Sequence, residues 1–430
     1  MLKNYIKIAF KVFLRRRFFT FVSLFGICFT LTVLMIVAAF IDYQIAPYPP
    51  ENKADRTLKI SEVILIQGLA PPAEKNVWTG NVGVGVVEQC VRQMETPEKI
   101  SLALRPNRVA VSYKDDEEFK LELKATDAAY WEILEFEFIE GRPFTAQEVA
   151  DRSPVAVINE ATRKRIFDGR PAAGRTLETL TGRYRVVGVV ENVPRFSRTA
   201  FADIWVPLDP SESNYPELGN LFGSLEVLLL ARSRVDFPRI KEELRTNIAR
   251  VDLSVAPGWE VIHAYADTPL EQLTRTASPT GYEREDTGEG QFRVLGSLTV
   301  AALLFMLLPA LNLINLNSSR ILERAPEIGV RKAFGASSRG LVGQFVVENL
   351  LLTLIGGVLS FVLSSLLLTM LSRIGFGWFA WSEYAEFRLN YRVFCYGLGC
   401  ALVLGLLSGV YPAWRMSRLH PAEALRGGQR

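Results

Sequence analysis

Four long segments of the sequence contain no charged residue. They are 18–41, 294–316, 349–371 and 393–414, and every Asp, Glu, Lys and Arg of a chain that is 22% charged lies outside them. A bilayer core of about 30 Å needs roughly 20 apolar residues in a helix, and each segment reaches that length. A single soluble domain does not separate its charges in this way. The sequence therefore predicts a membrane protein with four transmembrane helices, one N-terminal and three C-terminal.

Composition excludes several other classes of protein. Hydrophobic residues make up 49% of the 430-residue chain, too many for an intrinsically disordered or collagen-like protein. A net charge of +3 is too small to indicate a nucleic-acid partner. The first apolar segment is longer than a signal-peptide core and no clear cleavage site follows it, so we expect it to remain as an anchor.

The Lys and Arg residues of the short flanks predict the orientation. Residues 1–17 hold six, 317–340 hold five and 415–430 hold four, whereas 372–392 hold three that are offset by Glu383 and Glu386. Positive flanks stay in the cytoplasm, so both termini are expected there. The predicted parts are 1–17 (cytoplasmic amphipathic helix), 18–41 (first transmembrane helix), 42–292 (extracytoplasmic domain), 293–316 (second transmembrane helix), 317–340 (cytoplasmic loop), 341–371 (third transmembrane helix), 372–392 (short outer loop), 393–414 (fourth transmembrane helix) and 415–430 (cytoplasmic tail).

The N-terminal segment has a helical pattern of its own. Ile6, Phe10, Phe13 and Leu14 fall near one face, which is typical of a helix lying in the membrane interface. A basic flank that only orients the first span is the alternative.

The segment between the first two spans is predicted to be a large α+β domain with two lobes. The sequence indicates a strand at 57–67, a hairpin at 108–123 that turns at Lys114–Glu117, and an inserted lobe at about 126–208. A strand at LEVLLLA, a helix around 237–248 and a strand at WEVIHAY favour a βαβ-like return. Residues 274–290 are polar and rich in helix breakers, and predict a link to the second span.

Catalytic and metal-binding patterns are missing from the sequence. The chain has two histidines, and its four cysteines leave only Cys90 in the outer domain, where we expect a small buried apolar side chain or an intermolecular pairing site. Residues 169–176, GRPAAGRT, differ from a P-loop at one position. Since a helix precedes this segment and Arg replaces Lys, we interpret it as a turn. No cofactor, metal or catalytic residue is predicted.

The inner loop carries the most specific pattern. In RILERAPEIGVRKAFGAS, acids and bases recur at helical spacing, as Glu327 and Arg331 do, and Gly335 breaks the run. A charged helix between two spans is well placed to receive a push from a cytoplasmic protein, although a solvated charged loop explains the same pattern.

This loop resembles that of the MacB/FtsX-like permeases of ABC transporters. The resemblance covers essentially the whole chain: one span, an outer domain, three spans, EIGVRKAFGAS in the loop, and the closing YPAWRMSRLHPAEALR. VAVINEATRKRIF and RYRVVGVVENVP are similar to the inserted lobe of that family. The resemblance implies a location in a bacterial inner membrane and a dimer of permeases on two ATPase subunits, with ATP bound by the partner. It also implies that the loop contacts the ATPase through Arg324, Glu327, Ile328, Gly329, Arg331, Lys332 and Gly335.

The resemblance is compatible with several functions. The leading one is a MacB-like exporter in which a separate ATPase moves the outer domain through the helices, a process called mechanotransmission. A periplasmic adaptor or outer-membrane channel is then a possible partner, and the other permease is a second copy or a paralogue. The alternatives are an FtsX-like regulator of a cell-wall hydrolase, a Lol-like lipoprotein-extracting permease, and a receptor without an ATPase. The sequence leaves the substrate open.

Overall fold

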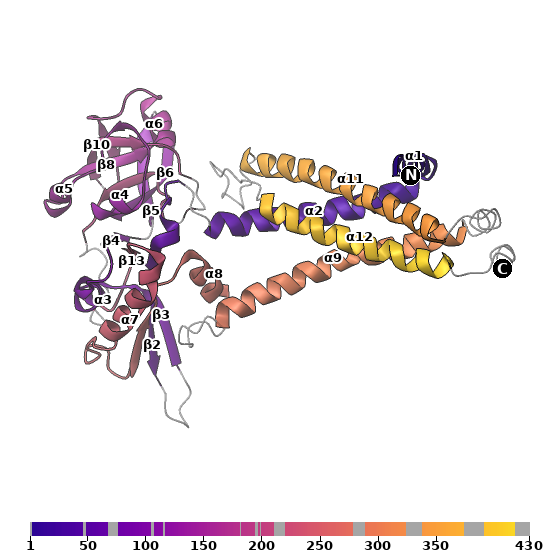
Figure 1. Cartoon of the computed structure of the whole chain (residues 1–430). Helices are drawn as coiled ribbons and strands as arrows, with labels where there is room; N and C mark the ends of the chain where they lie inside the picture. Colours follow the sequence, from indigo (N-terminus) through magenta and orange to yellow (C-terminus); the bar gives the residue numbers. More distant parts are fainter. Residues whose placement is uncertain are drawn as a thin grey trace. The chain divides into compact units, whose positions relative to one another are not determined.

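The computed structural model divides the chain into two compact units. One, the helical unit, comprises residues 1–42, 292–372 and 387–430, and the other, the sheet unit, comprises 43–291 with 373–386. Figure 1 shows the elements of both. The structure describes residues 2–45, 49–67, 76–104, 107–114, 117–180, 182–193, 197, 199–209, 220–277, 289–323, 338–373 and 391–417.

The helical unit contains one short and four long helices among its described residues. Their bounds are α1 (Leu2–Arg15), α2 (Arg17–Ile45), α9 (Glu289–Glu323), α11 (Ser338–Arg373) and α12 (Tyr391–Ser417). Each uncharged segment of the sequence lies inside one of the long helices. Within the described residues, two stretches are long and apolar enough to cross a membrane, Arg17–Ala39 and Gly343–Met370. The apolar stretches Phe292–Leu307 and Tyr391–Leu407 are shorter.

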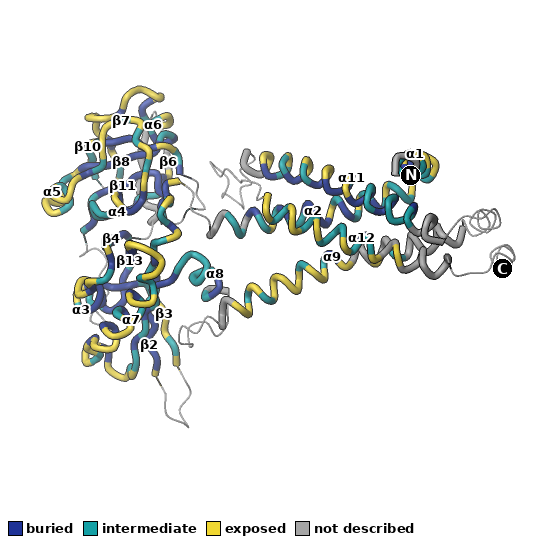
Figure 2. The backbone as a smooth tube through the Cα atoms, in the orientation of Figure 1, coloured by how far each residue is buried: buried dark blue, intermediate teal, exposed yellow. Residues whose placement is uncertain are grey.

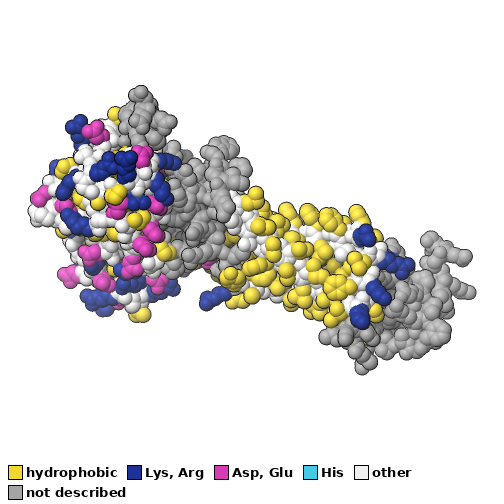
Figure 3. All heavy atoms as spheres, turned by 90° about the horizontal axis from the view of Figure 1, so that it is seen from above, with side chains coloured by type: hydrophobic (Ala, Val, Ile, Leu, Met, Phe, Trp, Pro, Cys, Tyr) yellow, Lys and Arg dark blue, Asp and Glu magenta, His cyan; other side chains and the backbone are white. Residues whose placement is uncertain are grey.

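Apolar side chains cover much of the surface of the long helices. In Figure 3 the visible face of this unit is hydrophobic, and Lys and Arg side chains gather toward one end. Phe21, Phe25 and Phe29 of α2 are all more than half exposed, and so is Tyr396 of α12. An exposed apolar surface of this extent is stable in a bilayer and not in water.

The N-terminal helix α1 is amphipathic, and the helical spacing of Ile6, Phe10, Phe13 and Leu14 places them near one face, as predicted. Ala9 and Phe13 are buried against Leu352 of α11, whereas Phe10 and Leu14 are exposed. That this helix lies in the membrane interface stays a prediction. One part of the apolar surface packs on a neighbouring helix, and the other part remains exposed.

The sheet unit is built on one mixed sheet. Its strands are β1 (Thr57–Ile60), β2 (Val63–Gln67), β3 (Asn76–Val82), β4 (Lys99–Leu104), β5 (Asn107–Lys114), β6 (Glu117–Thr126), β7 (Phe138–Gly141), β8 (Val155–Asn159), β9 (Thr176–Thr179), β10 (Gly182–Val190), β11 (Ile204–Pro207), β12 (Phe222–Gly223), β13 (Leu225–Leu230) and β14 (Val261–Ala264). Its helices are α3 (Val84–Gln89), α4 (Ala129–Ile133), α5 (Ala146–Ala150), α6 (Glu160–Phe167), α7 (Phe237–Ile248) and α8 (Pro269–Ala277).

The order of the strands is β14-β2-β3-β13-β4-β6-β11-β8-β10-β7, with β1 beside β13, β12 beside β3, β5 beside β6 and β9 beside β10. Only β8 with β10 and β6 with β11 pair in parallel among the described strands. Figure 2 shows the buried residues concentrated along these strands. Since the strands of 126–208 join the same sheet as the strands that flank them, the division into two lobes stays a prediction.

Each face of the sheet carries its own apolar cluster. Helices α3, α6 and α7 contribute to the larger cluster, with Val86, Phe167 and Leu244 as members. The smaller cluster, on the opposite face, contains Trp131 of α4 and Trp205 of β11, whose rings lie 6.0 Å apart. Alternate residues of a strand point to opposite faces, so the central strands contribute to both clusters.

Local sequence explains several elements. All five residues of β8 are buried, and Asn159 at its end caps α6 by accepting a hydrogen bond of 2.8 Å from the Thr162 amide. Helix α6 ends at Asp168, which adopts a left-handed conformation with φ 55°. The P-loop-like segment 169–176 follows as a turn before β9, as predicted. Cys90 is fully buried, as one of its two predicted alternatives required.

Three predictions about this unit were wrong in part. The strand expected at 57–67 is two strands, since β1 pairs with β13 whereas β2 pairs with β3 and β14. The expected βαβ-like return fails because three antiparallel pairings in succession, β13 with β3, β3 with β2 and β2 with β14, make β14 antiparallel to β13. Residues 274–277 of the expected link belong to α8, and 278–288 lie outside the described residues. The hairpin of β5 and β6 is confirmed, with Lys114 opposite Glu117.

Replacing Gly83 with Ala is predicted to destabilise the sheet unit by about 3 kcal/mol, an overpacking cost. A Cβ atom at this position would lie 2.0 Å from the carbonyl oxygen of Asn220 and 2.6 Å from that of Phe222. The measurement is thermal unfolding of the full chain in detergent. The control is Gly169→Ala, where φ is +71° but no atom lies within 4 Å, so that only a backbone cost of about 1 kcal/mol applies. Equal losses in the two variants would contradict the prediction.

Candidate functional site

The residues that the sequence singled out lie outside the described residues. They are Arg324, Glu327, Ile328, Gly329, Arg331, Lys332 and Gly335, between the end of α9 at Glu323 and the start of α11 at Ser338. The candidate site is therefore built from what flanks this segment: helix α11, which directly follows it, and the connections between the helices and the sheet unit.

The first described turns of α11 contain buried polar side chains. Gln344 and Glu348 are 6% and 4% exposed, and the Gln344 amide donates a hydrogen bond of 3.1 Å to the Glu348 carboxylate. The next residue in the sequence, Asn349, is also buried. One turn further on, Leu352 packs against α1. The beginning of α11 is therefore enclosed within the helical unit.

Glycines bring α11 close to its neighbours. A Cβ atom on Gly356 would lie 2.8 Å from Cγ2 of Ile27 in α2, and one on Gly357 would lie 2.5 Å from Cδ1 of Leu398 in α12. Small residues let helix backbones approach in this way in membranes. The Thr32 hydroxyl of α2 also donates a hydrogen bond of 3.5 Å to a carbonyl of α11. Figure 1 shows α2 and α12 running alongside α11. A shift of α11 is therefore resisted directly by α2 and α12.

The segment that follows α2 is fastened to the sheet unit. The carbonyl of Pro50 accepts a hydrogen bond of 2.9 Å from the Glu135 amide. The Lys53 ammonium lies 2.9 Å from the Glu135 carboxylate and donates a bond of 2.9 Å to the carbonyl of Glu132. The chain then enters β1 at Thr57.

The segment that leads toward α9 is fastened to the same strand. Lys59 of β1 and Asp267 exchange two backbone hydrogen bonds of 2.8 and 3.0 Å. The Asp267 carboxylate forms a bidentate ion pair with Arg275 of α8, at 2.8 Å for both bonds. Gln272 of α8 donates a bond of 2.9 Å to Ser61, just after β1. Both connections thus meet at a strand of four residues.

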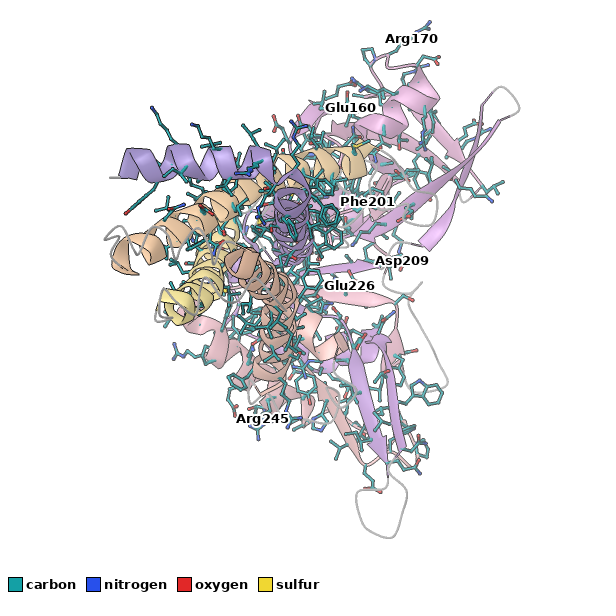
Figure 4. All side chains as sticks on the ribbon, turned by 90° about the vertical axis from the view of Figure 1, so that its right-hand side faces the viewer. Glu160, Arg170, Phe201, Asp209, Glu226 and Arg245 are labelled. Atoms are coloured by element: carbon teal, nitrogen blue, oxygen red, sulfur yellow. The ribbon has the colours of Figure 1, made fainter. Side chains whose placement is uncertain are left out.

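Three charged side chains lie buried on one face of the sheet beside β1. Lys59 of β1 lies 3.1 Å from the Glu226 carboxylate of β13, and Lys124 of β6 lies 3.6 Å from it. Their side chains are 10%, 6% and 0% exposed in the order Lys59, Glu226, Lys124. In Figure 4, Glu226 lies near the middle of the sheet unit, between the ends marked by Arg170 and Arg245. Both buried bases contact this one acid, and the charge of Glu51 acts on Lys124 in the same direction as that of Glu226.

A short segment covers these charges. The carbonyl of Thr199 accepts a hydrogen bond of 2.5 Å from Lys124 and one of 2.8 Å from the Tyr130 hydroxyl. The hydroxyl of Thr199 accepts a bond of 3.3 Å from Lys59. Ser197 in turn donates a hydrogen bond to Glu51, which precedes β1. Thr199 therefore joins β1, β6 and α4 at one point.

Burial changes how these groups titrate. Loss of solvation lowers the pKa of Lys124 from 10.5 to about 8, although Glu226 acts in the opposite direction. Loss of solvation also raises the pKa of the Tyr130 hydroxyl well above its usual value. Lys124 is therefore held in its charged form near neutral pH at a cost in folding free energy.

Sequence reasoning missed this group, although one signal was visible. Glu226 is the one charged residue among 221–231, in a run of otherwise apolar residues. A single charge in a buried strand requires a partner of opposite charge. The partners come from β1 and β6, which the sequence order does not place beside it.

Other chemistry is not supported by the described residues. No three His, Cys, Asp or Glu side chains among them are arranged to hold a metal. Burial, followed by the charge of Glu243, raises the pKa of Cys90 to about 12, so this thiol is not a nucleophile.

Two family models match the chain, in sequence order. Residues 20–247 match the MacB-like periplasmic core domain, and residues 299–421 match the FtsX-like permease C-terminal domain. The first match alone covers more than half of the chain, and it joins the first uncharged segment to the greater part of the sheet unit.

Individual proteins match the chain more distantly. The macrolide export ATP-binding/permease protein MacB of Pasteurella multocida is 24% identical over 69% of this chain and 41% of its own length. The uncharacterised ABC transporter permease YknZ of Bacillus subtilis is 21% identical over 72% of this chain and 71% of its own. The chain spans about two fifths of the length of the MacB relatives that it matches.

Solved structures of similar proteins align with about half of the chain. The periplasmic region of MacB from Actinobacillus actinomycetemcomitans aligns with 52% of this chain and 95% of that chain, with 14% identity and a TM-score of 0.35. The extracellular domain of YknZ from Gram-positive bacteria aligns with 48% of this chain and 98% of that chain, with 14% identity and a TM-score of 0.34.

Lys124→Met is predicted to keep the fold at pH 7, because Glu226 retains its closer partner Lys59. The pKa of Lys124 is about 8 in the folded chain and 10.5 when solvated. The unfolded chain therefore binds more protons between these values, and wild-type stability rises with pH across that window. The cost of the charged Lys124, on the order of 3 kcal/mol below pH 8, is absent from the Met variant.

The measurement is the melting temperature of both full-length proteins from pH 7 to 10.5. As the pH rises from 8 to 10.5, the melting temperature of the wild type is expected to rise relative to that of Lys124→Met. If the melting temperatures of the two proteins change with pH in parallel, burial of the charged Lys124 does not destabilise the folded chain.

Proposed function

Because the chain belongs to the family of MacB- and FtsX-like permeases of ABC transporters, we propose that it is a permease subunit driven by a separate cytoplasmic ATPase. ATP hydrolysis by that partner moves the loop between α9 and α11, and the helices convey the motion to the sheet unit outside the inner membrane. The output is export. The MacB-like match of residues 20–247 favours this output over an FtsX-like regulator or a Lol-like permease.

The topology that this function requires has four spans, formed by α2, α9, α11 and α12. Both termini and the loop 317–340 then face the cytoplasm, and the sheet unit lies outside. The six basic residues of 1–17 and the absence of charge from 18–41 support this orientation.

The close packing of α11 is the observation that carries the proposal. This helix follows the ATPase-facing loop directly and lies against α2 and α12 through Gly356 and Gly357. Well-packed helices transmit a displacement because their interiors are close to incompressible. Helix α2 continues toward β1, and α9 is reached from β1 through α8, so motion of the helices acts on the sheet unit at that strand.

The partners follow from the same proposal. Two ATPase subunits bind the loops of two permeases, and the second permease is a copy of this chain or a paralogue. Contact with the ATPase is assigned to the predicted loop residues, Arg324, Glu327, Ile328, Gly329, Arg331, Lys332 and Gly335. ATP is bound by the partner. An adaptor or an outer-membrane channel receives the substrate on the far side.

Glu327→Gln combined with Arg331→Gln is predicted to uncouple ATP hydrolysis from transport without unfolding the chain. The two side chains are expected to share one helical face that the ATPase contacts. The measurement compares ATPase activity with transport in the complex reconstituted with its co-purified ATPase. Glu178→Gln with Arg183→Gln is the control, since it removes an exposed ion pair of 3.0 Å in the sheet unit. Full coupling in the loop variant would show that the assigned contact is wrong.

Gly356→Leu is predicted to reduce transport at least tenfold while leaving ATP hydrolysis in place. The added side chain would push α2 away from α11, since even a Cβ atom would lie 2.8 Å from Ile27. Gly399→Leu on α12 is the matched control, because no atom lies within 4 Å of a Cβ atom there. If both variants transport equally well, the α2–α11 contact does not carry the motion.

A further inference from the structure

Thr199 lies in a segment that is held at both ends. On one side, Ser197 donates a hydrogen bond to Glu51, in the connection from α2. On the other side, the Asp203 carboxylate accepts bonds of 2.8 Å from the Glu122 amide of β6 and 3.1 Å from Asn159 of β8. The described residues of this segment, 197 and 199–203, therefore reach from the connection that follows α2 to the parallel strands of the sheet.

The middle of the segment is held by its own packing and by the buried charges. Ala200, Phe201 and Ala202 are at most 3% exposed and belong to the smaller apolar cluster. Apolar packing holds a segment in place without requiring charge. Two lysines and a glutamate are present as well, although buried ion pairs of this kind are often no more stabilising than apolar residues of similar volume.

What the charges provide is a directional link. Lys59 is bound on three sides: through its backbone to Asp267, and through its ammonium to Glu226 and Thr199. Lys124 contacts the same carboxylate and the same threonine from β6. A displacement of β1 therefore changes the distances between charged groups that face Thr199, in a region where electrostatic forces are weakly screened.

We propose that Lys59, Glu226 and Lys124 are positioning residues that tie segment 197–203 to β1, so that displacement of either connection to the helices is passed to β6 and β8. This relay rests on the proposed function for its source of motion, but the link itself is independent of any ATPase. Through this link, a displacement of the four residues of β1 reaches β6 and β8 in the other half of the sheet.

The first experiment tests the link in the full chain without an ATPase. The variant is the apolar triple Lys59→Met, Glu226→Met and Lys124→Met, in nanodiscs, followed by amide hydrogen exchange and thermal unfolding. Exchange at 199–203 is expected to rise about tenfold, because hydrogen bonds to charged groups are lost, while the melting temperature stays within a few degrees of wild type or rises. Unchanged exchange at 199–203 would overturn the proposal.

The matched control removes a different, half-buried ion pair. Arg163 and Glu140 lie 2.5 Å apart, and each side chain is 16% exposed. Arg163→Met with Glu140→Gln should leave exchange at 199–203 as in wild type. If this control loosens the segment as much as the triple variant does, the effect is general destabilisation and the relay is refuted. If the triple variant fails to fold, Lys124→Met alone takes its place. Amide exchange at 199–203 is then expected to rise, but by less than is expected of the triple variant.

The second experiment tests the relay in the complex with the co-purified ATPase. ATP is expected to change exchange in α11 and in 199–203 of the wild type, and in the triple variant only in α11. A change at 199–203 that persists in the triple variant would overturn the relay. If α11 does not respond to ATP in the wild type, the proposed function fails, while the first experiment still decides the link.

Discussion

Strand β1 is four residues long, yet the connection from α2 and the connection toward α9 are both attached to it. Its backbone pairs with β13 on one side and with Asp267 on the other, so neither edge is free along Lys59. The connection from α2 enters the strand at its N-terminal end, and α8 is fixed beside its C-terminal end through Ser61. In the proposed function, the helices act on the sheet through these two connections. The pairing of β1 therefore determines where force enters this unit.

The helices could be predicted from the sequence because their defining property is local. Absence of charge over 20 or more residues is visible without knowledge of neighbours, and each of the four segments is helical. The hairpin of β5 and β6 and the cap of α6 at Asn159 are local in the same sense, since a few consecutive residues specify each. The turn at 169–176 was distinguished from a P-loop by the order of helix and strand and by Arg175 in place of Lys.

The buried charges could not be predicted in this way. Lys59, Lys124 and Glu226 are far apart in the sequence, and although Glu226 stands out in an apolar run, nothing in the sequence identifies Lys59 and Lys124 as its partners. They meet because only β4 lies between β6 and β13 in the sheet, and because β1 rather than β2 pairs with β13. The break between β1 and β2 was missed for the same reason: TLKISEVILIQ alternates as a single strand would, and only long-range pairing divides it. Contact of the loop residues with an ATPase remains a prediction, since it depends on a second protein.

The sheet unit combines two means of holding segment 197–203, and they respond differently to movement. Apolar contacts of Phe201 and Ala202 are insensitive to direction, so that a small slide of one surface over another costs little as long as no cavity opens. The bonds of Lys59 and Lys124 to Thr199 are directional and weaken steeply when their angles change. A segment held only by apolar contacts would move less than β1 does. With the second kind at its centre, it follows β1 until the bonds break, so the buried charges limit how far the two parts of the sheet can move separately.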